Sequence, residues 1–386
     1  MTTEEVFFAL MRSILIGAPV EERIKEGIDA DILSQLYVFS EVHDLAHLIG
    51  AALAKCGKLG DDDCSKKFRA KAMLAVSRYE RINYDLQTIC DALEQAQIPF
   101  IPLKGSVLRA YYPEPWMRTS CDIDVLVHNE DLEKAAGILQ YKLGYSRKEK
   151  GQHDISFYSQ SGIHVELHYD LVEKGWANAA SDILNNVWNY AVQKKKSKYY
   201  FELSDDMFYY YHIAHMAKHI EQGGCGIKVF VDVWFLDGIN GADYNGRKKL
   251  LDKGNLLKFA HASQRLSRVW MEEHPHDSIT QQLQEYVFRG GAYGMMRNRI
   301  AALQRREGGK WRYLISKFII PYDVIKFIYP VLQKHRWLTP IYQVRRWIGL
   351  VYYGQTKRVI KELSYNQRLP KEQAQALEHL FKELGL

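Results

Sequence analysis

Cysteine is scarce in this sequence and shows no pairing pattern. The 386 residues include five cysteines, an odd number, scattered along the chain without a C-x-x-C pair. This spacing argues against a disulfide framework and against a structural zinc site. It favours a reducing, cytoplasmic compartment, in which thiols stay free.

Long apolar runs are also missing. No window approaches the roughly 18 consecutive apolar residues of a membrane-spanning helix. The sequence starts Met-Thr-Thr-Glu-Glu, which lacks the basic start and the apolar stretch of a signal peptide. We therefore expect a soluble, cytoplasmic protein without a membrane span.

What the sequence does contain is an uneven distribution of charge. The net charge is +6, yet residues 305–358 hold twelve Lys and Arg against two acidic residues, so the rest of the chain is net acidic. Trp, Tyr and Phe are interleaved with these charges. The composition is typical of a nucleic-acid groove or of a membrane-surface segment, and equally of helices with an aromatic core and solvated basic faces. RNA or another anionic partner is one expectation for this region.

Hydrophobic periodicity divides the chain into three regions. Residues 1–97 and 204–386 repeat apolar positions at helical spacing, whereas 98–203 alternate short strands with helices. The strands are predicted at 98–103, 122–127, 155–159 and 163–169. We predict an α+β fold: a small mixed-sheet core flanked by an N-terminal and a C-terminal helical region, the latter basic and aromatic-rich from about 305.

Two aspartates on one predicted strand are the first candidates for chemistry. Successive strand side chains point to opposite faces, so Asp122 and Asp124 share a face. Neighbouring carboxylates repel each other unless a cation or a shared proton relieves them. The same alternation puts Glu166 on one face with His164 and His168, and a neighbouring strand would bring Glu166 beside the aspartates. Three oxygen ligands suit Mg²⁺ or Mn²⁺, although the solvent face of an amphipathic strand gives the same Asp-x-Asp pattern.

A glycine-serine turn precedes that strand. Lys104, Gly105 and Ser106 follow the first predicted strand and open a short helix. Backbone N–H groups at such a position can cradle a phosphate group. The turn therefore favours a phosphate-containing ligand near the carboxylates.

These motifs match a known enzyme superfamily. The DNA polymerase β-like nucleotidyltransferases carry Gly-Ser after the first strand, then Asp-x-Asp, then one more acidic residue on a later strand, and this sequence resembles them at all three places. More narrowly, it resembles a bacterial family described as uncharacterised nucleotidyltransferases. The residues that carry the narrower resemblance are Lys104, Gly105, Ser106, Tyr112, Arg118, Asp122, Asp124, Glu166, His168, His215, His219 and Asp232. The sequence departs from the pattern of the family in the wide gap between Ser106 and Asp122.

The resemblance implies transfer of a nucleoside monophosphate from an NTP, with ATP the expected donor, to a hydroxyl of a small molecule, protein or RNA. By that resemblance Asp122 and Asp124 bind two divalent ions, and Glu166 completes the second site and helps to deprotonate or orient the hydroxyl. Phosphate contacts are implied for Lys104, Gly105, Ser106 and Arg118. The residues by themselves leave an alternative open, in which Lys104 and Arg118 are solvated surface residues.

Two alternatives to this hypothesis stay open. One is a catalytically silent nucleotide- or RNA-binding protein on the same fold. The other is a nucleotidyltransferase of the toxin–antitoxin kind, which modifies a protein side chain. The intact carboxylates favour an active enzyme, and the acceptor is not specified because one fold serves many acceptors.

A histidine stripe marks the first predicted helix of the C-terminal region. His212, His215 and His219 fall on one helix face, and only Glu221 offers a carboxylate nearby, which disfavours a zinc site. We expect these histidines to pack against another helix or to line a substrate pocket. The candidates for the substrate pocket are His164, His168, His215 and His219.

Overall fold

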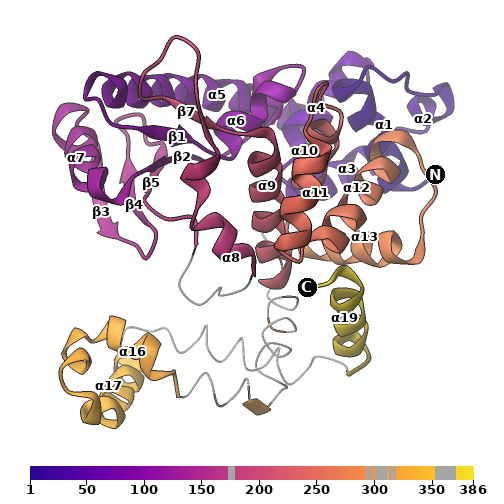
Figure 1. The fold of residues 1–386 in the computed structure, drawn as a ribbon. Coiled ribbons are helices and arrows are strands. Elements are labelled where there is room, and N and C mark those ends of the chain that lie inside the picture. Colours follow the sequence, from indigo (N-terminus) through magenta and orange to yellow (C-terminus); the bar gives the residue numbers. More distant parts are fainter. Residues whose placement is uncertain are drawn as a thin grey trace.

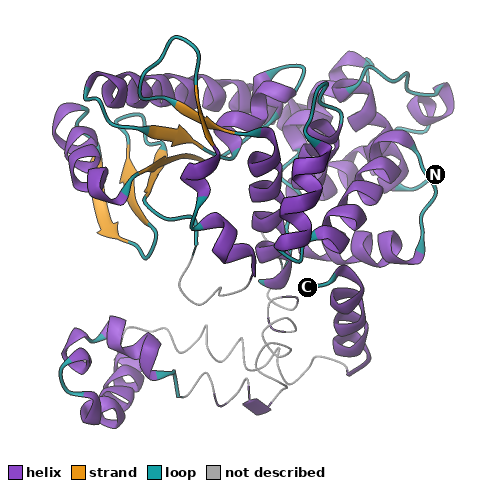
Figure 2. Ribbon diagram, viewed as in Figure 1, coloured by secondary structure: helices purple, strands orange, loops and turns teal. Residues whose placement is uncertain are grey.

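The structure, a computed structural model, describes residues 1–172, 179–292, 294, 298, 300, 311–312, 315, 319–352 and 371–386. Helices make up most of the molecule, and a small mixed sheet lies at one side of it (Figure 2). Helices precede and follow this sheet along the chain. The predicted α+β class is confirmed.

Helices fill the chain before the sheet. They are α1 (Thr3–Leu15), α2 (Glu22–Glu26), α3 (Ala30–Val42), α4 (Ala46–Lys55) and α5 (Asp63–Gln95). Local signals set where the main ones begin, because Thr2 and Glu5 form a capping box on α1 and Asp62 caps α5. The long α5 runs along the sheet in Figure 1, and its Ile82 and Ile89 are buried in the core beneath the strands.

The main sheet has five strands in the order β1-β2-β5-β4-β3. Their bounds are β1 (Phe100–Pro102), β2 (Asp122–Val127), β3 (Ser146–Lys150), β4 (Asp154–Tyr158) and β5 (His164–His168). The β2–β5 pair is parallel and the other neighbours are antiparallel. Alternate residues such as Ile123, Val125 and Val165 are buried against α5 and α7 (Leu132–Gly137). The opposite face therefore carries the polar side chains.

Smaller elements connect the sheet to the helices that follow. They are α6 (Gly105–Leu108), α8 (Ala179–Leu184) and the antiparallel pair β6 (Ala191–Gln193) and β7 (Phe201–Leu203). The region boundaries predicted near 97 and 203 fall between α5 and β1 and just after β7. The division into three regions stays a prediction.

The helices after the sheet pack against those before it. They are α9 (Asp205–Glu221), α10 (Ile227–Asp237), α11 (Tyr244–Lys253), α12 (Leu257–Glu272), α13 (Ser278–Gly290) and α19 (Lys371–Leu384). Phe8 of α1 stacks on Trp270 of α12, with ring centroids 5.2 Å apart, and on Phe288 of α13 at 6.0 Å. One apolar core thus joins the two ends of the described chain.

Part of the basic C-terminal segment forms a small helical unit of its own, residues 319–352. It contains α16 (Tyr322–Ile328) and α17 (Thr339–Tyr352), which appear in orange in Figure 1. Several of its apolar side chains are exposed, among them Trp337 and Ile348 at 74% and 64%. The rest of the basic segment, including 301–310 and 353–370, lies outside the described residues. Within the described chain, none of the helices has the length and apolar character needed to span a bilayer.

Candidate active site

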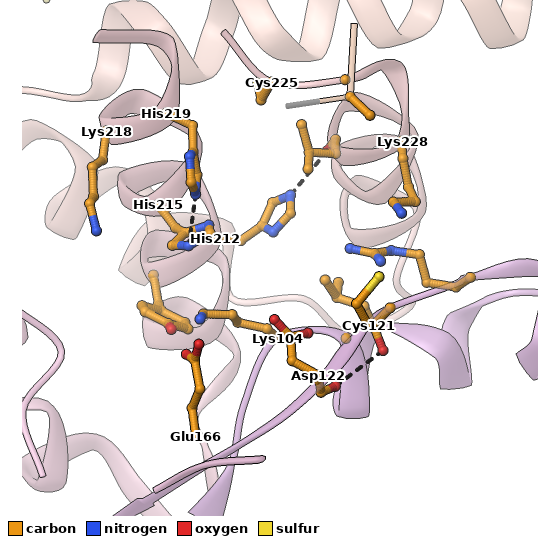
Figure 3. A pocket seen from close by; sticks show the side chains of 18 of the residues that line it. Lys104, Cys121, Asp122, Glu166, His212, His215, Lys218, His219, Cys225 and Lys228 are labelled. Atoms are coloured by element: carbon orange, nitrogen blue, oxygen red, sulfur yellow. Dashed lines mark hydrogen bonds between the residues drawn. The ribbon is translucent and has the colours of Figure 1, made fainter. Parts of the chain in front are cut away.

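A cavity of about 570 Å³ lies between the polar face of the sheet and helices α9 and α10. This volume is within the range of roughly 300–1,000 Å³ that is usual for small-molecule sites. Figure 3 shows Lys104, Asp122 and Glu166 on one side of the cavity, with His215 of α9 and Lys228 of α10 on the other. The sheet and the C-terminal helices therefore build the site together.

The carboxylates meet because β2 and β5 are parallel neighbours. Asp124 is in register with Glu166, and Asp122 with His164. Ile123, between the two aspartates, is fully buried on the opposite face. The predicted juxtaposition of Asp122, Asp124 and Glu166 on one sheet face is confirmed, while their catalytic role stays a prediction.

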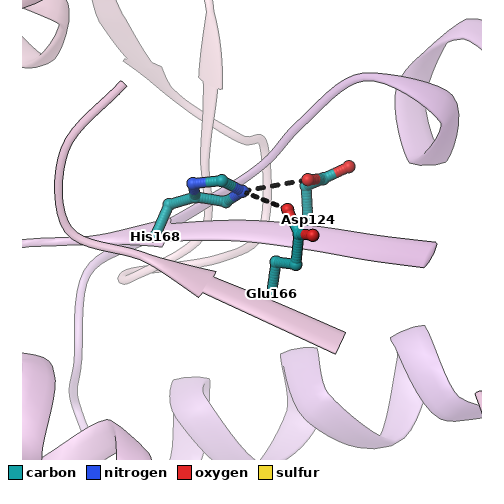
Figure 4. A group of neighbouring side chains, drawn as sticks. All are labelled: Asp124, Glu166 and His168. Carbon is teal, nitrogen blue, oxygen red and sulfur yellow. Dashed lines mark hydrogen bonds and ion pairs between the residues drawn. The ribbon is translucent and has the colours of Figure 1, made fainter. Parts of the chain in front are cut away.

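Asp124 is the most enclosed of the three carboxylates and is 1% exposed. Its Oδ1 accepts a hydrogen bond from Lys104 Nζ at 2.7 Å and lies 2.9 Å from His168 Nε2. His168 Nε2 is also 3.2 Å from Glu166 Oε2. Figure 4 shows His168 in contact with both carboxylates. Both contacts of Asp124 use the same oxygen, so within the described chain Oδ2 accepts no hydrogen bond.

These contacts decide which groups carry charge. Burial alone would raise the pKa of Asp124, but Lys104 and His168 outweigh it and hold that pKa well below its ordinary value. Burial would lower the pKa of Lys104, and the Asp124 carboxylate outweighs it and raises that pKa. The pKa of Asp122 is raised by burial and by the charge of Asp124. The site therefore holds an ionised carboxylate beside an ammonium group, with a second carboxylate that binds its proton more readily.

A group of side chains that could hold a metal ion lies at the same place. Asp124, Glu166 and His168 each offer a ligand atom, and within the described chain these atoms lie within 4.8 Å of one another. Two carboxylates and an imidazole fit a divalent ion such as Mn²⁺ or Mg²⁺. Asp122 is not part of this group, so its predicted share in metal binding stays a prediction. His168 was predicted to line a substrate pocket, and the register of β5 also places it against both carboxylates.

The turn at Lys104 has a constrained backbone. Lys104 has φ 46° and ψ −122°, a positive φ that a lysine rarely adopts and that costs about 1–3 kcal/mol. Gly105 follows, and a Cβ built there would lie 2.9 Å from Ser120 Cβ, so only glycine fits without displacement. Gly105 lines the cavity, whereas the Ser106 hydroxyl is buried and has no hydrogen-bond partner in the described chain. The phosphate contacts of both residues stay predictions.

Arg118 is held in a buried ion pair. Its Nε lies 2.7 Å from Asp232 Oδ1 and its Nη2 2.7 Å from Asp232 Oδ2, and Tyr112 donates a hydrogen bond to the same carboxylate at 2.8 Å. Burial would raise the pKa of Asp232, but the guanidinium outweighs it and lowers that pKa. Arg118 thereby ties the segment before β2 to α10. Its predicted contact with phosphate stays a prediction.

The three histidines of α9 all line the cavity. His212 Nε2 lies 3.0 Å from Val229 O, so this side chain packs against α10, one of the two expected roles. His215 and His219 face each other with their Nε2 atoms 3.2 Å apart. Burial holds the pKa of His215 well below its ordinary value, so its imidazole is neutral at pH 7.

Other predicted and unpredicted residues complete the picture. His164 is half-buried, with Nδ1 3.7 Å from Glu166 Oε1, and does not belong to the cavity lining. His43, directly after α3, and Lys228, in the first turn of α10, do line the cavity. No motif in the sequence marks His43, and Lys228 starts the stretch that ends at Asp232 in the family resemblance without a predicted role, because each reaches the cavity only through the packing of its helix.

Comparison with known families gives one result. A family model described as "Uncharacterised nucleotidyltransferase" matches residues 32–272, more than half of the chain. The matched segment runs from within α3 to the end of α12 and so contains the whole sheet, α9 and α10. Neither the curated proteins nor the solved structures include a significant match.

Proposed function

The chain belongs to the uncharacterised nucleotidyltransferase family, and from this premise we propose that it moves a nucleoside monophosphate from an NTP to a hydroxyl acceptor. The observation that carries the proposal is the register of β2 and β5, which sets the buried Asp124 beside Glu166, and Glu166 lines a cavity large enough for a nucleotide. The family supports nucleotidyl transfer in general, and the residues and steps below are our proposal.

We propose Mg²⁺ or Mn²⁺ as the cofactor. Asp124, Glu166 and His168 fit such an ion, because each offers a ligand atom at close range and Asp124 is held ionised. Asp122, which lines the cavity on the same sheet face, is the proposed further carboxylate ligand. When bound, the ion supplies charge neutralisation for the triphosphate and makes the attacking hydroxyl more acidic.

The protein side chains have separate tasks in the proposed reaction. The acceptor oxygen forms a bond to the α-phosphorus of the NTP, the bond from that phosphorus to pyrophosphate breaks, and pyrophosphate leaves with the electron pair. Glu166 accepts the proton of the acceptor hydroxyl, which requires a carboxylate within reach of the reacting oxygen. Lys104 and Gly105 line the cavity and hold the β- and γ-phosphates, with Ser106 and Arg118 as further proposed contacts. ATP is the proposed donor.

The acceptor occupies the part of the cavity opposite the carboxylates. His215 and His219 belong to this wall, and an imidazole ring can donate a hydrogen bond to a hydroxyl group or accept one from it. His168 touches Asp124 and Glu166 and orients both. His164 is a proposed second neighbour of Glu166, at its more exposed side.

The basic C-terminal region is proposed to bind RNA or another anionic partner. Support comes from its described part, in which the basic residues outnumber the single acid Asp323; they are Lys326, Lys334, Arg336, Arg345 and Arg346. Exposed rings such as Trp337 accompany these charges. Together they provide both phosphate contacts and stacking surfaces.

The proposed function is tested with the full-length chain and each of the four NTPs radiolabelled at the α-phosphate, with Mg²⁺ or Mn²⁺, and with RNA, protein and metabolite fractions as acceptors. We expect label transfer to one fraction. Asp124→Asn should lower the transfer rate at least about a hundredfold, because it removes the negative charge that is proposed to hold the metal ion and that pairs with Lys104. The binding of Mg²⁺-ATP to the same variant, measured by calorimetry, should fall as well.

Asp91→Asn is the matched control, because it makes the same change on the exposed face of α5, away from the cavity. It should leave transfer and binding unchanged. Nucleotide binding without transfer to any fraction would favour the catalytically silent alternative. Unchanged Mg²⁺-ATP affinity in Asp124→Asn would overturn the proposed site.

A further inference from the structure

The N-terminus of α10 opens into the cavity on the side away from the carboxylates. Gly226 is the N-cap of this 11-residue helix and no side chain caps it. Gly224, Cys225 and Gly226 all line the cavity, and Figure 3 shows Cys225 and Lys228 across it from Asp122 and Glu166. The first N–H groups of a helix have no partner within the helix, and they carry a partial positive charge.

A buried side chain without a partner lies at the same end of the cavity. His43 is 0% exposed and lines the cavity, and within the described chain neither of its ring nitrogens has a hydrogen-bond partner. Its ring is held in place by Phe39 and Phe288, with centroids 4.8 and 5.9 Å away. Burial lowers its pKa to about 4, so the ring is neutral at pH 7 and keeps one N–H donor. A buried polar group of this kind usually has a partner, and the described chain supplies none to His43.

Lys228 adds a cation next to these donors. Its Nζ lies 3.0 Å from Asp44 Oδ2 and 3.3 Å from Thr119 Oγ1, and it lines the cavity. An ammonium group has three N–H donors, so one is left for a ligand. The nearby acids are already paired with cations, Asp44 with Lys228 and Asp232 with Arg118. Among the described residues at this end of the cavity, an incoming anion therefore meets unused donors and no unpaired carboxylate.

We propose that the first turn of α10, His43 and Lys228 form an oxyanion subsite that binds a carboxylate or phosphate group of the acceptor. This inference rests on the proposed function, and it narrows the acceptor to a hydroxyl compound that carries such an anionic group. The donor triphosphate belongs to the opposite wall, where Lys104 and Gly105 lie beside the carboxylates. The subsite sets the acceptor at a fixed distance from the metal-binding group, which orients its hydroxyl for attack.

The test measures the binding of inorganic phosphate and, separately, of acetate to the full-length protein by calorimetry. Each titration is run with and without a saturating Mg²⁺ complex of an ATP analogue that has a methylene group between its α- and β-phosphorus atoms. We expect one of the two anions to bind with the same affinity in both conditions. If inorganic phosphate is the anion that binds, the acceptor carries a phosphate group; if acetate binds, the acceptor carries a carboxylate.

Two variants test the residues. His43→Phe keeps the ring packing and removes the N–H donor, and Lys228→Gln removes the charge. Each should weaken anion binding at least about tenfold, the usual cost of losing one hydrogen bond to a charged group. Lys248→Gln removes the same charge from the exposed face of α11 and should leave the affinity within about twofold. If Lys228→Gln lowers the folded fraction in a thermal scan, His43→Phe alone decides the result.

Three results would overturn the inference: neither anion binds, the anion competes with the nucleotide analogue, or both variants bind as the wild type does. Competition would assign the subsite to the donor. Failure of the proposed function looks different, because the wild-type protein would then not bind the nucleotide analogue at all. That result would refute both the proposed nucleotidyl transfer and the assignment of the subsite to the acceptor.

Discussion

Arg118 and Asp232 form a buried ion pair at the wall of the cavity, with side chains 9% and 0% exposed. Three hydrogen bonds join the guanidinium to the carboxylate, and Tyr112 adds a fourth to the same group. Taking two charges out of water costs several kcal/mol, which close pairing offsets. Removing one partner should therefore lower the free energy of unfolding more than removing both.

We expect Asp232→Asn to lower the free energy of unfolding by about 3–5 kcal/mol, because Arg118 stays charged and buried without a counter-ion. Urea denaturation at pH 7 measures the change. The double variant Asp232→Asn/Arg118→Met should recover part of the loss, since it also removes the buried cation.

Glu285→Gln is the control for this prediction. It breaks the exposed pair between Glu285 and Arg289 on α13 and should cost less than about 0.5 kcal/mol. A loss in Asp232→Asn that is no larger than the loss in Glu285→Gln would contradict a structural role for the buried pair. Arg118 would then be better explained as a phosphate contact alone.

At the scale of elements, the connection from β1 to β2 brings two backbones unusually close. Gly105 begins α6 directly after the strained Lys104, and Ser120 lies against it just before β2. Arg109 reinforces this contact, since it donates to Gly105 O at 2.9 Å and to Ser120 Oγ at 2.7 Å. The close approach sets where Lys104 stands relative to Asp124.

We expect Gly105→Ala to destabilise the protein by about 1–3 kcal/mol, because the new methyl group would overlap Ser120 and push α6 away from β2. Thermal unfolding measures the stability, and Mg²⁺-ATP titration measures the effect on the site. Adding Ser120→Gly should relieve the overlap and restore part of both. Gly137→Ala in α7 is the matched control, since its methyl group would meet only Tyr141 at 3.9 Å and should be neutral or slightly stabilising. Equal effects of the two alanines would count against the close approach as the cause.

At the scale of the whole molecule, the cavity beside the sheet and the basic helical unit 319–352 are built from different parts of the chain. The unit exposes apolar and basic side chains together. Arg336 lies 4.5 Å from the centroid of the Tyr322 ring, and Arg345 lies 5.6 Å from that of Tyr342. The composition also allowed helices whose aromatic side chains form a closed core. The exposed Trp337 does not fit that alternative.

If this unit binds RNA, its affinity should depend on salt. We expect the full-length protein to bind a single-stranded RNA with a linear fall of log affinity against log salt concentration. Arg336→Gln/Arg345→Gln should reduce the slope by about 1.4, or roughly 0.7 for each phosphate contact. Filter binding at several salt concentrations measures the slopes. Lys248→Gln/Arg289→Gln removes two exposed charges elsewhere and should not change the slope, and three equal slopes would refute RNA binding by this unit.

The sequence by itself determined the local features of the protein. Alternation along 122–127 predicted the strand and put Asp122 and Asp124 on one face, because the two-residue period of a strand is a property of neighbouring residues. The same argument placed Glu166 and His168 together on their own strand. The strands predicted at 155–159 and 163–169 are β4 and β5, neighbours in the sheet. The family resemblance rested on these same short motifs, and the family is confirmed.

Only the tertiary structure decided how those pieces meet. The parallel pairing of β5 with β2 brings His168 to Asp124 across 44 residues, and the packing of α10 brings Asp232 to Arg118 across 114. Lys104 was predicted to hold phosphate and donates a hydrogen bond to Asp124. His43 lines the cavity without any sequence signal, and Lys228 lines it without a predicted role. The physical reason is that periodicity and turn chemistry are local, whereas these contacts depend on how helices and strands distant in sequence bury their apolar faces against one another.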